Sequence, residues 1–155
     1  VYKTPFEQTS PGFKKVLANI TFAPIVELGS GRPFNILTGT DTNLDSSSNT
    51  DRPNVDPATG ALTLPRIGQI GSLGRNAGTT PGFASFDMRI AKFLPIGERV
   101  RIDFISEVFN LFNRVNVSTV NNDFRQVRFE DGNFKSPPTS VFDPRQFQFA
   151  VKISF

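Results

Sequence analysis

The chain has 155 residues, with no cysteine, histidine or tryptophan, and its aromatic residues are 17 phenylalanines and a single tyrosine. These absences exclude disulfide frameworks, Cys- or His-ligated zinc sites, and Ser-His-Asp or Cys-His catalytic pairs. Because the common catalytic pairs are missing, we predict no enzymatic activity. The net charge is only +3, from 17 basic and 14 acidic side chains. The basic residues do not form the cluster that nucleic-acid binding requires, so we also predict no nucleic-acid partner.

The N-terminal residues 1–13 are expected to form an extension, followed by a single antiparallel β domain over residues 14–155. Residues 1–5 read VYKTP and lack the charged region and apolar core of a signal peptide, which indicates a processed or truncated N-terminus. The sole tyrosine, Tyr2, lies outside every predicted strand. No window reaches the roughly 20 apolar residues of a transmembrane helix.

Strict alternation of apolar and polar residues dominates four stretches, namely residues 16–28, 83–93, 100–108 and 147–155. A period of two is typical of strands with one apolar and one polar face. Within the first stretch, Pro24 indicates a sheet edge or a bulge, because proline cannot donate a ladder hydrogen bond. Residues 94–98, LPIGE, contain two turn formers, so the second and third stretches are predicted to form a hairpin. No stretch shows a clear helical period.

Two long polar segments, residues 39–82 and 113–143, lie between these strands and are rich in Gly, Ser, Asn, Asp and Pro. Loops of this length are uncommon in compact domains. Long connections alternating with a tight turn are typical of outer-membrane barrels. We therefore predict an all-β fold with about four long antiparallel strands of a partial or oligomer-completed β-barrel and two long polar loops.

The first polar segment contains a candidate calcium site with four oxygen-bearing side chains: Asp41, Asn43, Asp45 and Asp51. Alternate Asp and Asn residues open the calcium loop of an EF-hand, and Ca²⁺ is the one cofactor that the sequence suggests. The loop pattern is incomplete, because Ser46 stands where that loop has glycine and Arg52 where it has glutamate. The alternative interpretation of the same residues is an ordinary Asx-rich, solvated turn.

The last stretch is the candidate assembly strand, with five apolar residues in alternation: Phe147, Phe149, Val151, Ile153 and Phe155. Alternation alone does not distinguish a lipid-facing band from a sandwich core or a seam between subunits. The polar positions of the long strands carry six charged residues: Glu27, Asp87, Arg89, Arg101, Asp103 and Glu107. They fit either the lining of a hydrophilic lumen or a solvent face with weak ion pairs.

Several short motifs follow one another along the chain: SGRPF at residues 30–34, DTNLD at 41–45, DRPN at 51–54, GRNAG at 74–78, PGF at 81–83, EVFNLFN at 107–113 and DPRQ at 143–146. In this order they resemble the C-terminal barrel region of TonB-dependent outer-membrane receptors, especially the Oar-like group. The resemblance implies the last strands of a transporter barrel in the outer membrane of a Gram-negative-type bacterium. It also implies that a plug domain and TonB box, absent from this sequence, are needed for transport.

Four strands are too few to close a barrel, and an open sheet leaves two rows of unpaired backbone groups. The expected partners are therefore the remainder of a larger barrel or copies of the same chain, together with outer-membrane lipid. The alternative function is a self-assembling extracellular subunit that builds a filament or oligomer by strand addition. A third possibility is a small β-sandwich binding module. The lack of the Tyr and Trp girdles of membrane barrels favours packing against protein.

Overall fold

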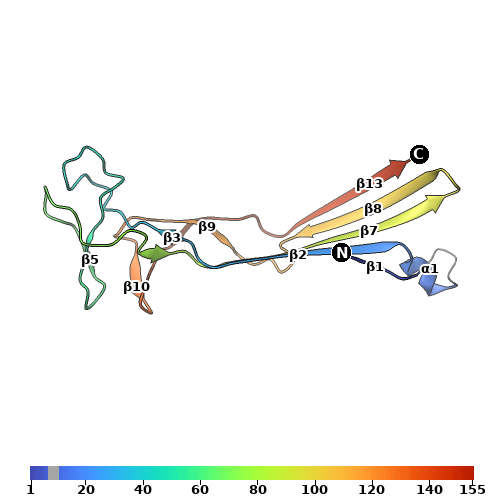
Figure 1. Ribbon diagram of the computed structural model, residues 1–155, viewed down its shortest axis with the longest axis horizontal. Coiled ribbons are helices and arrows are strands. Elements are labelled where there is room, and N and C mark those ends of the chain that lie inside the picture. Colours follow the sequence, from blue (N-terminus) through green and yellow to red (C-terminus); the bar gives the residue numbers. More distant parts are fainter. Residues whose placement is uncertain (7–10) are drawn as a thin grey trace. The chain divides into compact units, whose positions relative to one another are not determined.

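The computed structural model describes residues 1–6 and 11–155 and divides into two compact units (Figure 1). Unit 1 comprises Val1–Leu28, Ala84–Val115 and Asp143–Phe155, and unit 2 comprises Gly29–Phe83 and Asn116–Phe142. Each unit is therefore assembled from segments that are far apart in the sequence. Within the described residues, no helix has the length and apolar character needed to cross a membrane.

Unit 1 is built on a five-stranded sheet with the order β1-β2-β7-β8-β13. Its strands are β1 (Tyr2–Lys3), β2 (Ile20–Gly29), β7 (Phe83–Ile96), β8 (Val100–Phe109) and β13 (Gln146–Ser154). The pairs β1–β2, β7–β8 and β8–β13 are antiparallel. The prediction of an all-β fold with long antiparallel strands is confirmed, and within the described residues no sheet closes into a barrel.

The predicted hairpin is β7–β8, and its strands extend to the pair Ile96↔Val100. Gly97 adopts a positive φ of 64° in the turn, a conformation that glycine reaches without steric cost. β7 continues through Pro95, which the sequence had assigned to the turn. Pro95 lies opposite Arg101 at the end of the ladder, where a missing donor is tolerated.

The first predicted strand is shorter than expected, because residues 13–17 form the helix α1 (Phe13–Leu17) and β2 begins only at Ile20. Asn19 separates the two elements with a positive φ of 58°, a conformation that commonly ends helices. The prediction that Tyr2 lies outside the strands was wrong, since Tyr2 pairs with Phe22 in β1. β1 covers β2 only at Thr21 and Phe22, so Pro24 lies beyond the stretch that β1 pairs.

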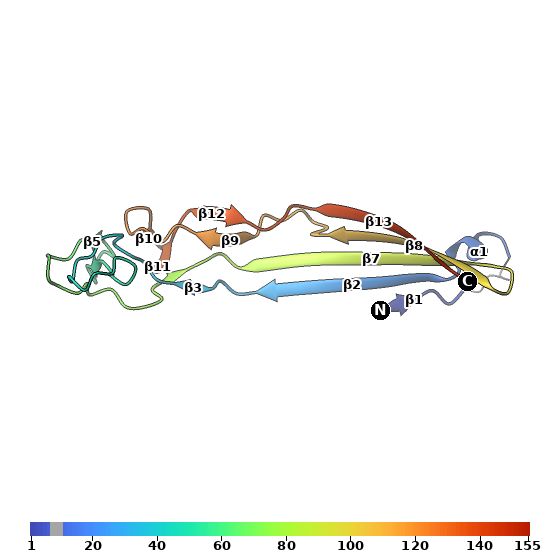
Figure 2. The ribbon, with the colours of Figure 1, turned by 90° about the horizontal axis from the view of Figure 1, so that it is seen from above.

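Unit 2 contains most of the two predicted long loops, and they carry short strands (Figure 2). A four-stranded sheet has the order β10-β11-β6-β3, and two further pairs are β12-β9 and β4-β5. The strands are β3 (Pro33–Phe34), β4 (Asn54–Val55), β5 (Leu62–Thr63), β6 (Gly78–Thr79), β9 (Val117–Val120), β10 (Arg128–Glu130), β11 (Asn133–Lys135) and β12 (Pro138–Val141). The two polar segments thus fold together rather than as separate loops.

The core of unit 2 consists of Ile36, Leu73 and Phe134, which are buried. Six partly buried hydrophobic residues pack around them: Phe34, Val55, Leu62, Ala77, Phe124 and Val127. Gly78 permits the close approach of Phe34, because a Cβ atom at Gly78 would lie 2.4 Å from the Phe34 ring. The ring therefore packs directly onto the β6 backbone.

We expect Ile36→Ala to destabilise unit 2 by about 2–5 kcal/mol, because it removes three carbon atoms from a fully buried site and leaves a cavity. The matched control is Ile67→Ala in the same unit, where the side chain is 79% exposed and the change should be close to neutral. Hydrogen exchange at the amide of Leu73, which bonds the Pro53 carbonyl, measures the effect. Equal exchange in the two variants would contradict this assignment of the core.

Candidate functional site

The register of β7, β8 and β13 sorts their side chains onto two faces of the sheet of unit 1. Directly opposed residues of antiparallel strands project to the same face. One such row is Met88, Val108 and Phe147, and the adjacent row is Arg89, Glu107 and Gln148. The same alternation continues along the ladder, so each face is defined by residue pairs and does not depend on sequence period alone.

The first face, which we call the apolar face, carries hydrophobic side chains from all three strands. Its members in the paired region are Met88, Ile90, Leu94, Ile96, Val100, Ile102, Phe104, Val108, Phe147, Phe149, Val151 and Ile153, with Ser106 and Lys92 as the polar exceptions. Many of these side chains are largely solvent-exposed in the isolated chain, and Phe149 reaches 75%. An apolar surface of this extent marks contact with lipid or protein.

The second face, which we call the polar face, carries ion pairs. Arg89 contacts Glu107 across the β7–β8 ladder at 3.1 Å, and Arg101 contacts Asp103 at 2.7 Å. Lys152 lies directly opposite Asp103 on β13. The guanidinium of Arg101 also lies 4.2 Å from the centre of the Phe93 ring, which is thereby covered by a charged group.

A separate group of hydrogen bonds fixes the polar face at the end where β8 stops. Asp87 accepts hydrogen bonds from the Ser85 hydroxyl at 2.9 Å and from the Asn110 amide at 2.8 Å. The Asn110 side chain in turn binds the Arg114 carbonyl and amide. This group holds the FNLFN segment of the resemblance in a tight turn after β8, with positive φ at Asn110 and Asn113.

Strand β13 forms one edge of the sheet, because its neighbour in the strand order is β8 alone. Its nine residues pair with β8 from Gln146↔Phe109 to Ser154↔Arg101. The opposite edge of β13 therefore presents a row of backbone groups with no strand beside it in the described residues. Four predicted assembly residues (Phe147, Phe149, Val151 and Ile153) are on this strand, and Phe155 directly follows it; their role in assembly remains a prediction.

The four residues of the calcium hypothesis lie in unit 2 as two hydrogen-bonded turns. Asp41 accepts hydrogen bonds from the amides of residues 44–46, and Asn43 and Asp45 bond one another. Asp51 is 4% exposed and accepts from the amide and hydroxyl of Thr42. Within the described chain, no group of three His, Cys, Asp or Glu residues could hold a metal ion. Calcium binding remains a prediction, and the hydrogen bonds account for these residues as Asx turns.

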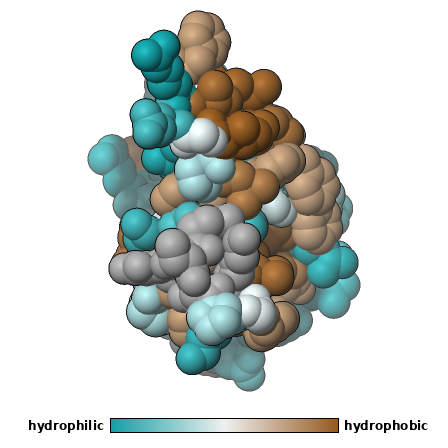
Figure 3. Space-filling view, turned by 90° about the vertical axis from the view of Figure 1, so that its right-hand side faces the viewer, coloured by the Kyte–Doolittle hydropathy of each residue, from teal (hydrophilic) through white to brown (hydrophobic). Residues whose placement is uncertain are grey.

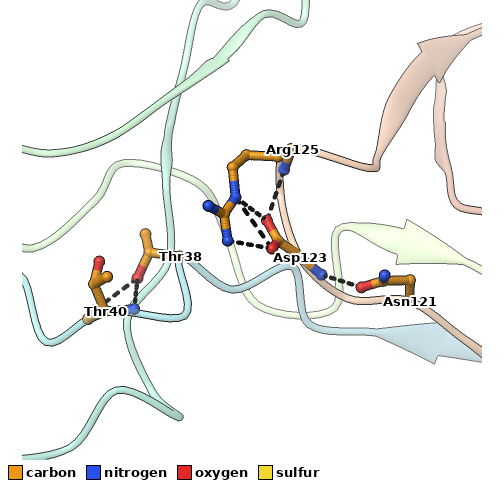
Figure 4. A network of polar contacts seen from close by, with 5 residues as sticks. All are labelled: Thr38, Thr40, Asn121, Asp123 and Arg125. Atoms are coloured by element: carbon orange, nitrogen blue, oxygen red, sulfur yellow. Dashed lines mark hydrogen bonds and ion pairs between the residues drawn. The ribbon is translucent and has the colours of Figure 1, made fainter.

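Sequence reasoning missed a polar network within the second long loop of unit 2, at residues 121–125 (Figure 4). Asp123 forms a forked contact with the Arg125 guanidinium, including a bond of 2.9 Å from Nε to Oδ1, and also accepts the Arg125 amide. The Asp123 amide bonds the Asn121 side chain at 2.9 Å. Leu37 bonds this turn on both sides, from its amide to the Asn122 carbonyl and from its carbonyl to the Phe124 amide. A pair of oppositely charged residues two apart gives no recognisable signal in the sequence.

The Arg125 side chain, followed by the Arg125 amide, lowers the pKa of the Asp123 carboxyl below its ordinary value. A lowered folded-state pKa contributes stability that is present above the unfolded-state pKa. This contribution disappears as the pH falls through the lowered pKa of Asp123. We therefore expect the turn that binds Leu37 to be less stable in acid.

We expect Asp123→Asn to accelerate hydrogen exchange at the amides of Leu37 and Phe124 at neutral pH, because it removes the charge that orders the turn. The parent chain should lose part of the same protection on acidification to about pH 2–3, relative to the intrinsic exchange rate. The control is Asp131→Asn, which removes a different ion pair, with Lys135, on the turn between β10 and β11. Unchanged exchange in Asp123→Asn would show that the network does not hold the turn.

Comparison with known proteins adds one match to this geometry. Residues 1–148 match the family described as an outer membrane beta barrel domain. No curated protein and no solved structure matches the chain. The match spans both units and all of the motifs at residues 30–146, and it agrees with a long antiparallel sheet that has one apolar and one polar face. The chain belongs to the outer membrane beta barrel domain family.

Proposed function

We propose that this chain is a non-enzymatic segment of a TonB-dependent-receptor-like barrel in the outer membrane of a Gram-negative-type bacterium. In this proposal the apolar face contacts lipid and the polar face lines the lumen. The main support for this proposal is the register of β7, β8 and β13. It places Arg89, Arg101 and Asp103 on the polar face, and Phe104, Phe147 and Phe149 on the apolar face. Apolar-out and polar-in alternation is the pattern of transmembrane barrels.

The strand lengths support a membrane-spanning role. β2 and β8 have 10 residues each, β13 has nine and β7 has 14. A tilted strand of about 9–11 residues crosses the hydrocarbon region of a bilayer. Each long strand of unit 1 is thus sufficient to span a membrane, and the tight β7–β8 turn fits the short connections on one side of such barrels.

The open edge of β13 requires a partner in a membrane, because unpaired backbone groups are very costly in lipid. In the proposed receptor this partner is a further strand of the same barrel, which closes the sheet. The motif order at residues 30–146 supports transport-related ancestry of the receptor type. Transport itself would belong to the complete barrel, whose lumen this polar face would line only in part.

The alternative is a self-assembling extracellular subunit that builds a filament or oligomer by adding β13 to an edge strand of another copy. The observation that favours it is the aromatic composition, because 17 phenylalanines are accompanied by Tyr2 as the sole tyrosine and by no tryptophan. Membrane barrels carry Tyr and Trp at the headgroup level, whereas phenylalanine also suits a dry protein seam.

Two neighbouring positions of β13 distinguish these functions, because Phe149 lies on the apolar face and Ala150 on the polar face. The chain has no cysteine, so Phe149→Cys and Ala150→Cys each place a single fluorescent label. In outer-membrane vesicles, we expect nitroxide-bearing lipids to quench the label at 149 strongly and the label at 150 weakly. Weak quenching at both positions would contradict the lipid-facing barrel, and excimers between copies labelled at 149 would select the self-assembling subunit.

An arginine at each position provides the energetic version of this test. Phe149→Arg should reduce the stability of the membrane-inserted protein by about 2–4 kcal/mol if the position lies near the bilayer midplane. Ala150→Arg adds the same charge to the polar face and should have a much smaller effect. The measurement is the fraction of folded, heat-modifiable protein recovered in vesicles across a urea series. Equal losses in the two variants would contradict the assignment of the faces.

A further inference from the structure

Lys92 is the one charged residue on the apolar face within the paired region of β7, β8 and β13. It lies opposite Phe104 and between Ile90 and Leu94 along the same face. A charged side chain on a lipid-facing surface is destabilising unless its ammonium reaches polar groups. The position of Lys92 therefore requires an explanation that the two-faced pattern does not supply.

The Lys92 ammonium binds the carboxyl end of helix α1. It donates hydrogen bonds to the backbone carbonyls of Val16 and Ala18, the latter at 3.1 Å. The last carbonyls of a helix have no partner within the helix. Because the Lys92 side chain leaves the sheet on the apolar face, the C-terminal end of α1 lies on that side of the sheet.

The neighbouring carbonyls at this helix end also have donors. The Thr4 hydroxyl bonds the Leu17 carbonyl at 2.7 Å, and the Phe93 amide bonds the Asn19 carbonyl at 3.2 Å. Ala18 is fully buried between these contacts. Four consecutive carbonyls are thus satisfied by protein donors and do not depend on water, which is the condition for placing a helix end in a water-poor environment.

The outer surface of α1 has the composition of a membrane-interface element. Phe13 and Val16, three residues apart and hence on one side of the helix, are 73% and 60% exposed. Lys14 is exposed beside them. Exposed apolar side chains adjacent to lysine suit the boundary between acyl chains and anionic headgroups.

The location of α1 agrees with this composition. Both ribbon views place α1 at the same end of the sheet as the β7–β8 turn (Figures 1 and 2). The view of this end in Figure 3 shows hydrophobic residues next to hydrophilic ones. Lys92 is also near this end of the sheet. It lies four residues before Ile96, the last residue of β7 before the turn, which is about 13 Å along the strand.

We propose that α1 is an interfacial anchor, held on the apolar face by Lys92, that inserts Phe13 and Val16 into the membrane boundary and directs Lys14 to anionic lipid headgroups. The inference rests on the proposed function, because it requires the apolar face to contact lipid. It assigns Lys92 as a positioning residue whose ammonium donates hydrogen bonds to helix carbonyls. The lysine is thereby compatible with a lipid-facing strand, and α1 extends the lipid-contacting surface beyond the sheet.

The test uses a single fluorescent label at Phe13→Cys in the protein refolded into phosphatidylcholine vesicles containing a minority of phosphatidylglycerol. Quenchers attached at the lipid headgroup region should quench this label strongly. Lys92→Met, which keeps a long unbranched side chain but removes its charge, should reduce that quenching several-fold, because α1 loses its attachment. The matched control is Lys152→Met on the polar face, which should leave the quenching at 13 unchanged.

A label at Phe149→Cys, measured with nitroxides along the lipid acyl chains, separates the two proposals. Strong quenching at 149 with none at 13 would overturn the anchor and leave the lipid-facing barrel intact, whereas no quenching at either position would overturn both. Unchanged quenching at 13 in Lys92→Met would overturn the role of Lys92. If Lys92→Met does not fold, Lys92→Arg retains the cation and should preserve the quenching at 13, and its loss in that variant would count against the proposal. Replacing phosphatidylglycerol with phosphatidylcholine should weaken the quenching at 13 but not at 149.

Discussion

Backbone hydrogen bonding between neighbouring strands is the interaction on which unit 1 depends, because its side chains bury little apolar surface. Among its described residues, Ala18 is the buried hydrophobic side chain, whereas the apolar residues of β13 are largely exposed. In water, a sheet of this kind has no hydrophobic core to stabilise it, and its edge strands have unpaired backbone groups. Its stability must come from what covers the apolar face and from what pairs with β13. In a closed barrel, one environment meets both requirements, since lipid covers the face and another strand completes the ladder.

The two faces then follow from a single choice of register. A shift of one residue between β8 and β13 would move Phe149 to the polar face and Lys152 among the hydrophobic residues, so every row of the ladder opposes such a slip. Across the neighbouring β7–β8 ladder, the ion pair Arg89–Glu107 adds to the specificity of register more than to stability, because exposed pairs contribute only a fraction of a kcal/mol. Lys92 breaks the pattern locally, and its contact with the α1 carbonyls shows how a polar group is accommodated without a change of register.

The parts of the fold that could be predicted from the sequence are those in which neighbouring residues carry the information. Alternation identified β7, β8 and β13, and Pro95 and Gly97 marked the end of the hairpin, although the strand continues through Pro95. Helix α1 was missed because five residues are too few to show a helical period, and Val16 also fits the alternation of the strand that follows. The core of unit 2 was not predictable, since Ile36, Leu73 and Phe134 meet only after two distant polar segments fold together. Likewise, the hydrogen bond from the Thr42 hydroxyl to Asp51 depends on loop geometry that the sequence does not reveal.

The aromatic composition acquires a different meaning once α1 is considered together with the sheet. Tyr and Trp serve membrane barrels because each combines an apolar ring with a hydrogen-bonding group at the headgroup level. Phenylalanine supplies only the ring, so a chain with 17 phenylalanines and a single tyrosine needs separate polar groups at the same depth. At the α1 end of unit 1 these groups are present, with Phe13 beside Lys14 on the helix, and with the Lys92 ammonium bound to helix carbonyls. A Phe side chain with a lysine nearby reproduces the amphipathic character of a Tyr or Trp girdle. The scarcity of Tyr and Trp is therefore weaker support for an interface between subunits. The apolar face is then better suited to contact with lipid.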